Sequence, residues 1–184
     1  MFIEGFDLNI RLFRWVNSHH TVLLDWFFKG FSYLGTGWVL PAVVAFLVLK
    51  RDYLRLKVLA VSVFLESTLV YLFKKLLNQP RPGAVLDDVH LLVNLKQGSF
   101  PSGDTALAAV LAVVFSWRSP NWVRACLALY VILIGYGRMY LGVHFPLDVL
   151  VGVLLGLLCG VAVLWTLRKG QPNLRIRDNT EIRS

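Results

Sequence analysis

The sequence predicts an all-α fold, a bundle of helices that span a membrane. Of the 184 residues, 57% are hydrophobic and 16% are charged, which is far too apolar for an ordinary soluble domain of this size. Several apolar runs also approach the length of about 20 residues that a helix needs to cross the hydrocarbon core of a bilayer. We therefore expect a polytopic integral membrane protein.

The individual spans follow from the apolar runs. Four runs of nearly full length cover residues 54–76, 103–117, 121–139 and 146–167. A fifth run, at 36–49, is short, and the segment before it carries Asp25, Lys29 and several glycines. We predict five spans, or six if residues 20–34 also enter the membrane.

The two ends of the chain differ from the spans. In a helix over residues 2–16, one stripe is apolar, with Phe2, Ile3, Phe6, Ile10, Phe13 and Val16. A second stripe is charged, with Glu4, Asp7, Arg11 and Arg14. This pattern predicts either an amphipathic helix in the membrane interface or an ordinary helix packed on the protein's own spans. The chain after Gly170 is polar and lacks apolar periodicity, so we expect one membrane-embedded domain over residues 1–170 and a disordered tail at 171–184.

The charge balance is basic, with 19 Lys and Arg against 11 Asp and Glu and a formal net charge of +8. Such a balance suits nucleic acid, anionic lipid or an anionic substrate. Most basic residues lie beside apolar segments, and no basic run alternates with aromatic residues, so nucleic acid is not expected as a partner. Cys126 and Cys159 lie inside apolar runs and provide neither a disulfide framework nor CxxC metal spacing.

The positions of the basic residues orient the predicted spans, because cytoplasmic loops carry the excess of Lys and Arg. Three segments hold eleven of the nineteen: Lys50, Arg51, Arg55 and Lys57; Arg118 and Arg124; and Arg168, Lys169, Arg175, Arg177 and Arg183. We predict that these segments are cytoplasmic and that the protein lies in the cytoplasmic membrane. The other side faces the periplasm or the cell exterior and carries Lys74, Lys75, Arg81, Lys96 and Arg138.

Three short polar segments at the ends of apolar runs, all on that outer side, contain the candidate functional residues. The first holds Lys74 and Arg81, and the prolines on either side of Arg81 prevent the helix from continuing. An Arg can bind phosphate oxygens through two parallel hydrogen bonds, and a Lys adds a point charge. The structural alternative is a pair of cations that anchor a span at the membrane border.

The second segment is Pro101-Ser102-Gly103-Asp104, directly before the Ala- and Val-rich run. If a helix begins here, its first amide groups, its positive dipole end and the Ser102 hydroxyl form an anion site. Gly103 would let the backbone approach the anion closely. The alternative is a plain helix N-cap followed by an acidic first-turn residue.

The third segment joins two runs, one ending at Arg138 and the next beginning at Pro146. It contains His144, and Asp148 follows four residues later, in the first turn of the next helix. A His that attacks phosphorus needs a group that holds its tautomer and stabilises its imidazolium, and a carboxylate does both. A structural His beside a capping Asp is the alternative.

Together the patterns Lys-x6-Arg-Pro, Pro-Ser-Gly-x and Arg-x5-His-x3-Asp resemble the type 2 phosphatidic acid phosphatase superfamily, whose membrane branch includes bacterial lipid phosphatases. The match extends from Lys74 to Asp148. The resemblance implies that His144 is a nucleophile that forms a phospho-histidine, that Asp148 orients it, and that no metal or other cofactor is required. It also implies that phosphate is bound by Lys74, Arg81, Ser102, Gly103 and Arg138.

One catalytic position departs from the family pattern. The resemblance implies a His as the fourth residue of the second motif, acting as general acid to the leaving oxygen, and this chain has Asp104. An Asp among cations at a helix N-terminus is expected to stay ionised and therefore cannot donate a proton. We expect a leaving group that needs little protonation, as in a diphosphate or a sugar 1-phosphate. His90, in the same loop system, is the alternative proton donor.

Glu66 is an unusual charge inside a predicted span. It lies eight residues before Lys74, which places the two on the same side of a helix without direct contact. We predict that Glu66 faces the helix bundle.

These features predict a metal-independent phosphatase that acts on a membrane lipid at the outer surface of the cytoplasmic membrane. The candidate substrates are lipid A 1-phosphate, undecaprenyl diphosphate and phosphatidylglycerophosphate. A phosphotransferase that passes the phosphoryl group to a lipid hydroxyl would use the same residues. A transporter of anionic lipid headgroups is the alternative of a different class, but it should show internal repeats or paired broken helices, and the sequence contains no repeat. Soluble vanadate-binding haloperoxidases share the motifs, although not the apolar spans.

Overall fold

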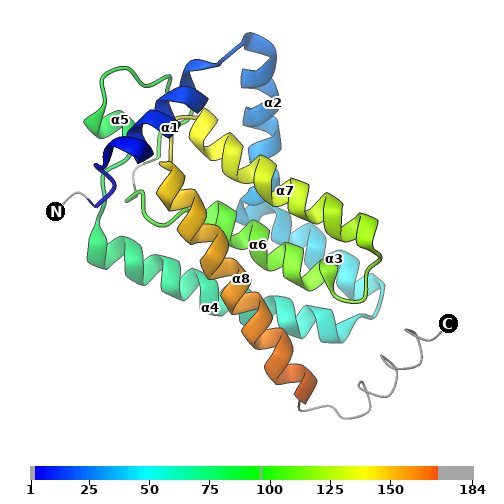
Figure 1. Cartoon of the computed structure of the whole chain (residues 1–184). Helices are drawn as coiled ribbons and strands as arrows, with labels where there is room; N and C mark the ends of the chain where they lie inside the picture. Colours follow the sequence, from blue (N-terminus) through cyan, green and yellow to red (C-terminus); the bar gives the residue numbers. More distant parts are fainter. Residues whose placement is uncertain (1–2, 96, 170–184) are drawn as a thin grey trace.

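The centre of the bundle is α6 (Gly103–Ser116), a helix rich in Ala and Val. It packs against three longer helices, α4 (Tyr53–Leu77), α7 (Asn121–Tyr140) and α8 (Pro146–Lys169). The computed structural model describes residues 3–95 and 97–169, and all regular structure in these residues is helical (Figure 1). The predicted all-α class is confirmed. The predicted tail, residues 171–184, lies outside the described residues.

The predicted runs and the observed helices have nearly the same boundaries. Three segments are long and apolar enough to cross a membrane: Tyr53–Val85, Asn121–Tyr140 and Pro146–Lys169. The first includes the short helix α5 (Pro82–Val85). The run predicted at 103–117 is α6, whose 14 residues extend over about 21 Å at 1.5 Å per residue, less than a bilayer core of about 30 Å. Helix length therefore supports three spans in the described chain, or four with the bent pair below, and does not confirm five.

The short run predicted at 36–49 belongs to a bent pair of helices. The pair comprises α2 (Val22–Ser32), η1 (Tyr33–Gly35), η2 (Gly37–Val39) and α3 (Leu40–Leu49), with a bend of 63° between Gly35 and Gly37. Thr36, between the two short 3₁₀ segments, has an extended backbone with ψ 163°, which interrupts the helix. The segment from Val22 thus continues into the predicted fifth run, but in a different direction.

Helices α6 and α8 pack closely because α8 presents a row of glycines to α6. Gly152, Gly156 and Gly160 are spaced by four residues and lie on one face of the helix. A Cβ atom at Gly152 would overlap the carbonyl oxygen of Ser102, and one at Gly156 would overlap that of Ala106. The two helix N-termini consequently lie side by side, and the amide of Ser102 donates to the carbonyl oxygen of Asp148 at 3.0 Å.

The N-terminal helix α1 (Asp7–Ser18) packs against α7 and α8. Phe13 and Val16, from the predicted apolar stripe, are buried, and the Phe13 ring lies 5.3 Å from that of Phe145. This packing matches the alternative of a helix docked on the protein's own spans. A different apolar row remains exposed on α1, formed by Leu8, Leu12 and Trp15. The helix begins later than the pattern over residues 2–16 predicts, so Glu4 lies before it and is buried rather than part of a polar stripe.

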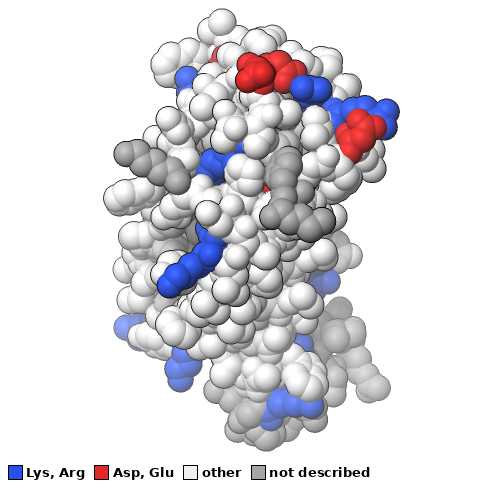
Figure 2. All heavy atoms as spheres, turned by 90° about the vertical axis from the view of Figure 1, so that its left-hand side faces the viewer, with Lys and Arg blue, Asp and Glu red and all other residues white. Residues whose placement is uncertain are grey.

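The basic segments predicted to be cytoplasmic meet at one end of the bundle. The Arg55 guanidinium donates to the carbonyl oxygen of Trp117 at 2.6 Å, and those of Arg118 and Arg168 lie 4.8 Å and 6.0 Å from the Trp117 ring. In Figure 2, the lower end of the visible face carries Lys and Arg, whereas the Asp and Glu seen on that face lie in the upper half. The three polar segments gather at the opposite end, where α4 and α7 finish and α6 and α8 begin (Figure 1).

Candidate active site

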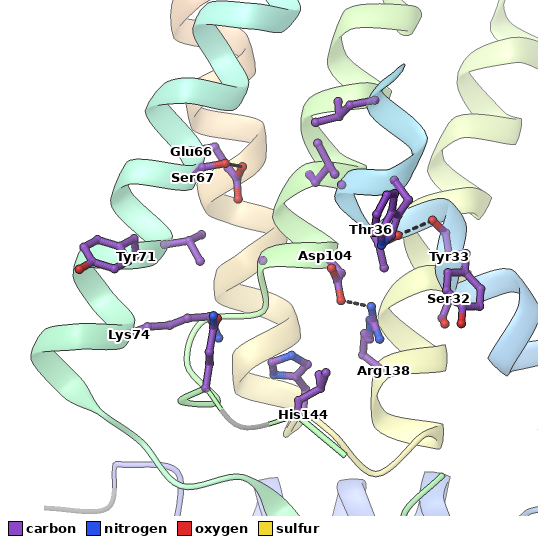
Figure 3. A pocket seen from close by; sticks show the side chains of 18 of the residues that line it. Ser32, Tyr33, Thr36, Glu66, Ser67, Tyr71, Lys74, Asp104, Arg138 and His144 are labelled. Carbon is purple, nitrogen blue, oxygen red and sulfur yellow. Dashed lines mark hydrogen bonds and ion pairs between the residues drawn. The ribbon is translucent and has the colours of Figure 1, made fainter. Parts of the chain in front are cut away.

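The three polar segments meet around one cavity of about 850 Å³. Its polar end is lined by Lys74, Arg81, Gly103, Asp104, Arg138 and His144. Figure 3 shows that the labelled side chains of this set come from separate helices and the turn before α8, and that they point toward a common space. Side chains far apart in the sequence thus form a single site.

His144 and Asp148 form a buried pair at the start of α8. The His144 Nδ1 atom lies 3.1 Å from Asp148 Oδ2, and both residues are almost fully buried. Because an ionised carboxylate only accepts hydrogen bonds, Nδ1 carries the proton and donates it to Asp148. The other ring nitrogen, Nε2, then presents its lone pair near Arg81, whose Nη1 lies 3.4 Å away.

The His144 imidazole is held in its neutral form. Burial, together with the charges of Arg81 and Lys74, lowers the pKa of His144 to about 4, although the contact with Asp148 acts in the opposite direction. A neutral imidazole whose Nε2 carries no proton is the form that can act as a nucleophile at neutral pH.

The turn that carries His144 is built by a glycine and two backbone contacts. Gly142 has φ +77°, and a Cβ atom there would lie 2.8 Å from the carbonyl oxygen of His90, so only glycine fits without strain. The carbonyl oxygen of Leu141 accepts from the Leu92 amide at 3.2 Å, and that of Val143 accepts from Arg81 at 2.7 Å. These contacts hold the turn, so that His144, two residues before the start of α8, faces the cavity.

Lys74 and Arg81 point inward, and neither extends toward the membrane border as the anchoring alternative requires. Helix α4 ends at Asn78, which has a left-handed backbone with φ 40°. The Lys74 ammonium donates to the carbonyl oxygens of Gly98, at 2.5 Å, and Ser99, at 3.1 Å. Arg81 donates to the carbonyl oxygens of Gln97 and Val143. Both cations therefore brace the cavity wall and also line the cavity.

The second polar segment forms the start of α6. Ser102 is the N-cap residue, yet its side chain makes no cap hydrogen bond within the described chain. Its hydroxyl oxygen is buried and has no hydrogen-bond partner among the described residues. Gly103, the first residue of the helix, lines the cavity. The Ser102 hydroxyl is therefore not used as a plain cap, and the first amide groups of α6 point toward the cavity end of the bundle.

Asp104 and Arg138 form an ion pair in the cavity wall (Figure 3). Arg138 is 4% exposed, so the pair keeps its guanidinium from being buried without a partner. An ion pair with a guanidinium favours the ionised form of a carboxyl group. In this arrangement Asp104 contacts Arg138 in the cavity wall.

Two further residues considered from sequence have different positions. Glu66 is buried and lines the same cavity as Lys74, which confirms that it faces the bundle, and it accepts a hydrogen bond from Ser67 at 3.1 Å. The ring of His90 instead stacks on that of His20 at 3.8 Å, and its Nε2 lies 3.4 Å from Asp25. His90 is not among the residues that line the cavity, so the structure does not place it at the site.

Sequence reasoning missed two residues that contact the His144–Asp148 pair. The Ser99 hydroxyl donates to Asp148 Oδ2 and lies 3.4 Å from His144 Nδ1. Glu4 is fully buried and interacts electrostatically with Asp148, Lys74 and Arg81. Ser99 stands just outside the Pro-Ser-Gly motif, and Glu4 is about 140 residues from Asp148, so neither carried a local signal in the sequence.

The chain is thus a bundle of apolar helices with a candidate anion site, in which His144 is held by Asp148 and three cations line the same cavity. The sequence profile of the PAP2 superfamily matches residues 55–171, and the chain belongs to that superfamily. The matched region includes every residue of the three motifs. The N-terminal helix α1 and the bent pair lie before it.

Several known proteins are similar to this chain. An undecaprenyl-diphosphatase from Sulfolobus acidocaldarius is 29% identical over 155 residues, which cover 83% of this chain and 75% of that protein. The crystal structure of Aquifex aeolicus LpxE has a TM-score of 0.86 at 49% identity, covering 89% of this chain and 99% of that one. The crystal structure of a transmembrane PAP2-type phosphatidylglycerolphosphate phosphatase from Bacillus subtilis has a TM-score of 0.76 at 24% identity, covering 90% and 87%, and shows the shared fold.

Proposed function

We propose that the protein is a phosphatase that removes a phosphate group from a membrane lipid phosphate or diphosphate through a phospho-histidine. The observation that carries this proposal is the geometry of His144. Its Nδ1 is held by Asp148 at 3.1 Å, its Nε2 is beside Arg81, and its low pKa keeps it neutral. Similarity to an undecaprenyl-diphosphatase supports the same reaction class.

The reaction has two steps. The His144 Nε2 lone pair attacks phosphorus, an N–P bond forms, and the P–O bond to the leaving group breaks, with the electron pair going to that oxygen. Asp148 stabilises the resulting imidazolium. Water then attacks phosphorus, the N–P bond breaks, the electron pair returns to Nε2, and inorganic phosphate is released together with the proton that water loses.

The phosphoryl group would be held by residues on several sides of the cavity. Lys74, Arg81 and Arg138 supply positive charge, and the Ser102 hydroxyl and the first amides of α6 supply donors. Fixed cations of this kind can neutralise the charge that spreads over the phosphoryl oxygens in the transition state. We therefore propose that the reaction requires no metal ion, and activity retained in a chelator would test this point.

The rest of the cavity suits an amphipathic substrate. From its polar end, the cavity extends between α4 and the bend in the α2–α3 pair, past Val63, Val70, Tyr33 and Trp38. These side chains provide a mostly apolar wall, and Trp38 is 81% exposed at its edge. We place the lipid phosphate at His144 and the adjoining apolar part of the lipid along this wall, with entry from the side of the bundle.

The same arrangement supports a proposed orientation and number of spans. The basic end around Trp117 faces the cytoplasm by the positive-inside rule, so the site faces the periplasm or the cell exterior. We propose five spans in the cytoplasmic membrane, with the bent α2–α3 pair as one and the short α6 as another. Helix α1 lies in the outer interface, with Leu8, Leu12 and Trp15 toward lipid.

The Asp104–Arg138 pair bears on which lipid is cleaved. Because Asp104 is paired as a carboxylate, the site lacks an acid at the position where the family pattern has a His. We propose a substrate with a good leaving group, namely undecaprenyl diphosphate or lipid A 1-phosphate, ahead of phosphatidylglycerophosphate. Native protein and Asp104→His should be compared on all three lipids and on a simple alkyl phosphate. If native protein already cleaves the alkyl phosphate best, the leaving-group proposal is wrong.

The central test is phosphate release by purified protein from the three lipid classes. His144→Ala should lower kcat on the order of 10³-fold or more while the thermal melt shows a folded protein. Brief reaction with lipid labelled on its terminal phosphate should leave acid-labile label on native protein and none on the variant. Full turnover by His144→Ala would exclude the phospho-histidine mechanism. Analysis of the products separates release to water from transfer to a lipid hydroxyl.

A further inference from the structure

A second carboxyl group lies behind the His144–Asp148 pair. Glu4 is fully buried. Neither of its carboxyl oxygens accepts a hydrogen bond from any of the described residues. The same holds for Asp148 Oδ1. Two buried carboxylates side by side are strongly unfavourable unless a proton is added, because neither can donate to the other.

The two oxygens of Asp148 have different surroundings. Oδ2 accepts from His144 Nδ1 at 3.1 Å, from the Phe145 amide at 2.8 Å, and from the Ser99 hydroxyl. Oδ1 accepts none of these hydrogen bonds, and the Glu4 carboxyl lies within interaction distance of the Asp148 carboxyl. A donor at Glu4 would therefore complete the hydrogen bonding of Asp148 on the side away from His144.

Specific contacts keep Glu4 in this position. The Ile3 amide donates to Gln79 Oε1 at 2.9 Å, which ties the segment to the end of α4. The Asn9 side chain donates to the Glu4 carbonyl oxygen at 2.8 Å and accepts from the Leu147 amide at 3.0 Å. Asn9 is itself 2% exposed. The N-terminal segment is thus attached to the first turn of α8, one residue before Asp148.

The charged groups that face Glu4 come from three elements: Asp148 from α8, and Lys74 and Arg81 from the end of α4 and the segment after it. Burial, and secondarily Asp148, raise the pKa of Glu4 far above its ordinary value, in spite of the two cations. Both effects favour a protonated Glu4, which would have one hydrogen-bond donor.

We propose that Glu4 is a positioning residue for the reaction, whose protonated carboxyl donates a hydrogen bond to Asp148 Oδ1. The bond fixes the plane of the Asp148 carboxylate, so that Oδ2 stays directed at His144 Nδ1. Glu4 does not touch the substrate and gives up no proton during turnover. This role rests on the proposed nucleophilic function of His144.

Two substitutions of similar size separate a neutral donor from a charge. Glu4→Gln keeps a donor to Asp148 Oδ1 and should stay within a few-fold of native kcat. Glu4→Leu removes the donor and should lower kcat by about tenfold or more, with little change in KM. Asp7→Asn, at an exposed residue of the same segment, is the matched control and should behave like native protein. Equal losses in Glu4→Gln and Glu4→Leu would show that a neutral donor is not sufficient, and no loss in Glu4→Leu would show that no donor is needed. Either result overturns the proposal.

A pH profile tests the proton directly, with a readout that a merely structural Glu4 would not move. As the pH rises through the raised pKa of Glu4, native protein should lose the donor, so the ratio of native to Glu4→Gln kcat/KM should fall. Titration of Lys74, Arg81 or His144 affects both proteins and largely cancels in the ratio. A ratio independent of pH would contradict the proposal.

Infrared spectroscopy tests the same proton without any turnover. The sequence contains only three glutamates, Glu4, Glu66 and Glu181, so ¹³C-glutamate labelling gives a simple carboxyl spectrum. At neutral pH, the difference between native protein and Glu4→Gln should show a protonated carboxyl band. Absence of that band would refute the proposal about Glu4, whereas retained activity in His144→Ala would refute the proposed function, so the two failures can be told apart.

Discussion

The two ends of the helix bundle carry the same kinds of basic side chain in opposite environments. At the site, Arg138 is 4% exposed and paired with Asp104, and Arg81 is held by backbone carbonyl oxygens. At the other end, Arg118 and Arg168 lie against the ring of Trp117 near the surface. Removing a cation from water is unfavourable unless other interactions compensate, so buried cations within membrane helices mark function, whereas exposed cations at helix ends set orientation.

The largest effect should come from the partner of the nucleophile. Asp148→Asn keeps the size of the side chain but allows its amide to donate, which favours the wrong tautomer of His144. We expect kcat to fall on the order of 10³-fold, measured by phosphate release, with the fold retained. Activity within tenfold of native protein would show that Asp148 is not needed to hold the tautomer.

A matched pair of substitutions compares the two ends directly. Arg138→Ala should lower kcat/KM by about 10²-fold or more, because a fixed cation at the phosphoryl group is lost. Arg168→Ala, at the opposite end, should leave kcat/KM nearly unchanged. Similar losses in both variants would mean that burial does not distinguish functional cations from orienting ones.

The packing that brings the two N-termini together can be broken separately from the chemistry. Gly156→Leu places a side chain against the carbonyl oxygen of Ala106, so α6 and α8 must separate. We expect a loss of about 1–3 kcal/mol in stability, seen as a lower melting temperature in detergent. Leu158→Ala, at an exposed position of the same helix, is the control. Unchanged stability in Gly156→Leu would show that the glycine row is not needed for close packing.

An effect of similar size concerns acid stability. The folded-state pKa of His144, about 4, is below its ordinary value of 6.5, so the unfolded chain binds more protons between these values. Native protein should therefore lose stability as the pH falls from about 6.5 toward 4, and this contribution should be constant above 6.5. Relative to His144→Asn, which cannot take up that proton, the loss should be about 1–3 kcal/mol. Parallel stability curves for the two proteins would contradict a buried, neutral His144.

The sequence predicted much of the site because motif residues occur at the ends of apolar runs. Lys74, Arg81, Arg138 and His144 could be assigned to one end of the bundle from span boundaries and charge counting alone. Glu4 could not, because a helical pattern over residues 2–16 placed it on a polar stripe, whereas α1 begins only at Asp7. The number of spans also could not be read from apolar length, since α6 has 14 residues and the α2–α3 pair is bent.

By itself, the sequence determined the helical membrane class, the boundaries of the four longest apolar runs within a few residues, and the polar segments that face one another, because these depend on apolar length and local spacing. Tertiary structure alone decided the ion pair of Asp104 with Arg138, the contacts of Ser99 and Glu4 with Asp148, and the distance of His90 from the cavity. These features depend on the packing of α6 against α7 and α8 and on the docking of the N-terminal helices. Such long-range contacts leave no periodic pattern in the chain.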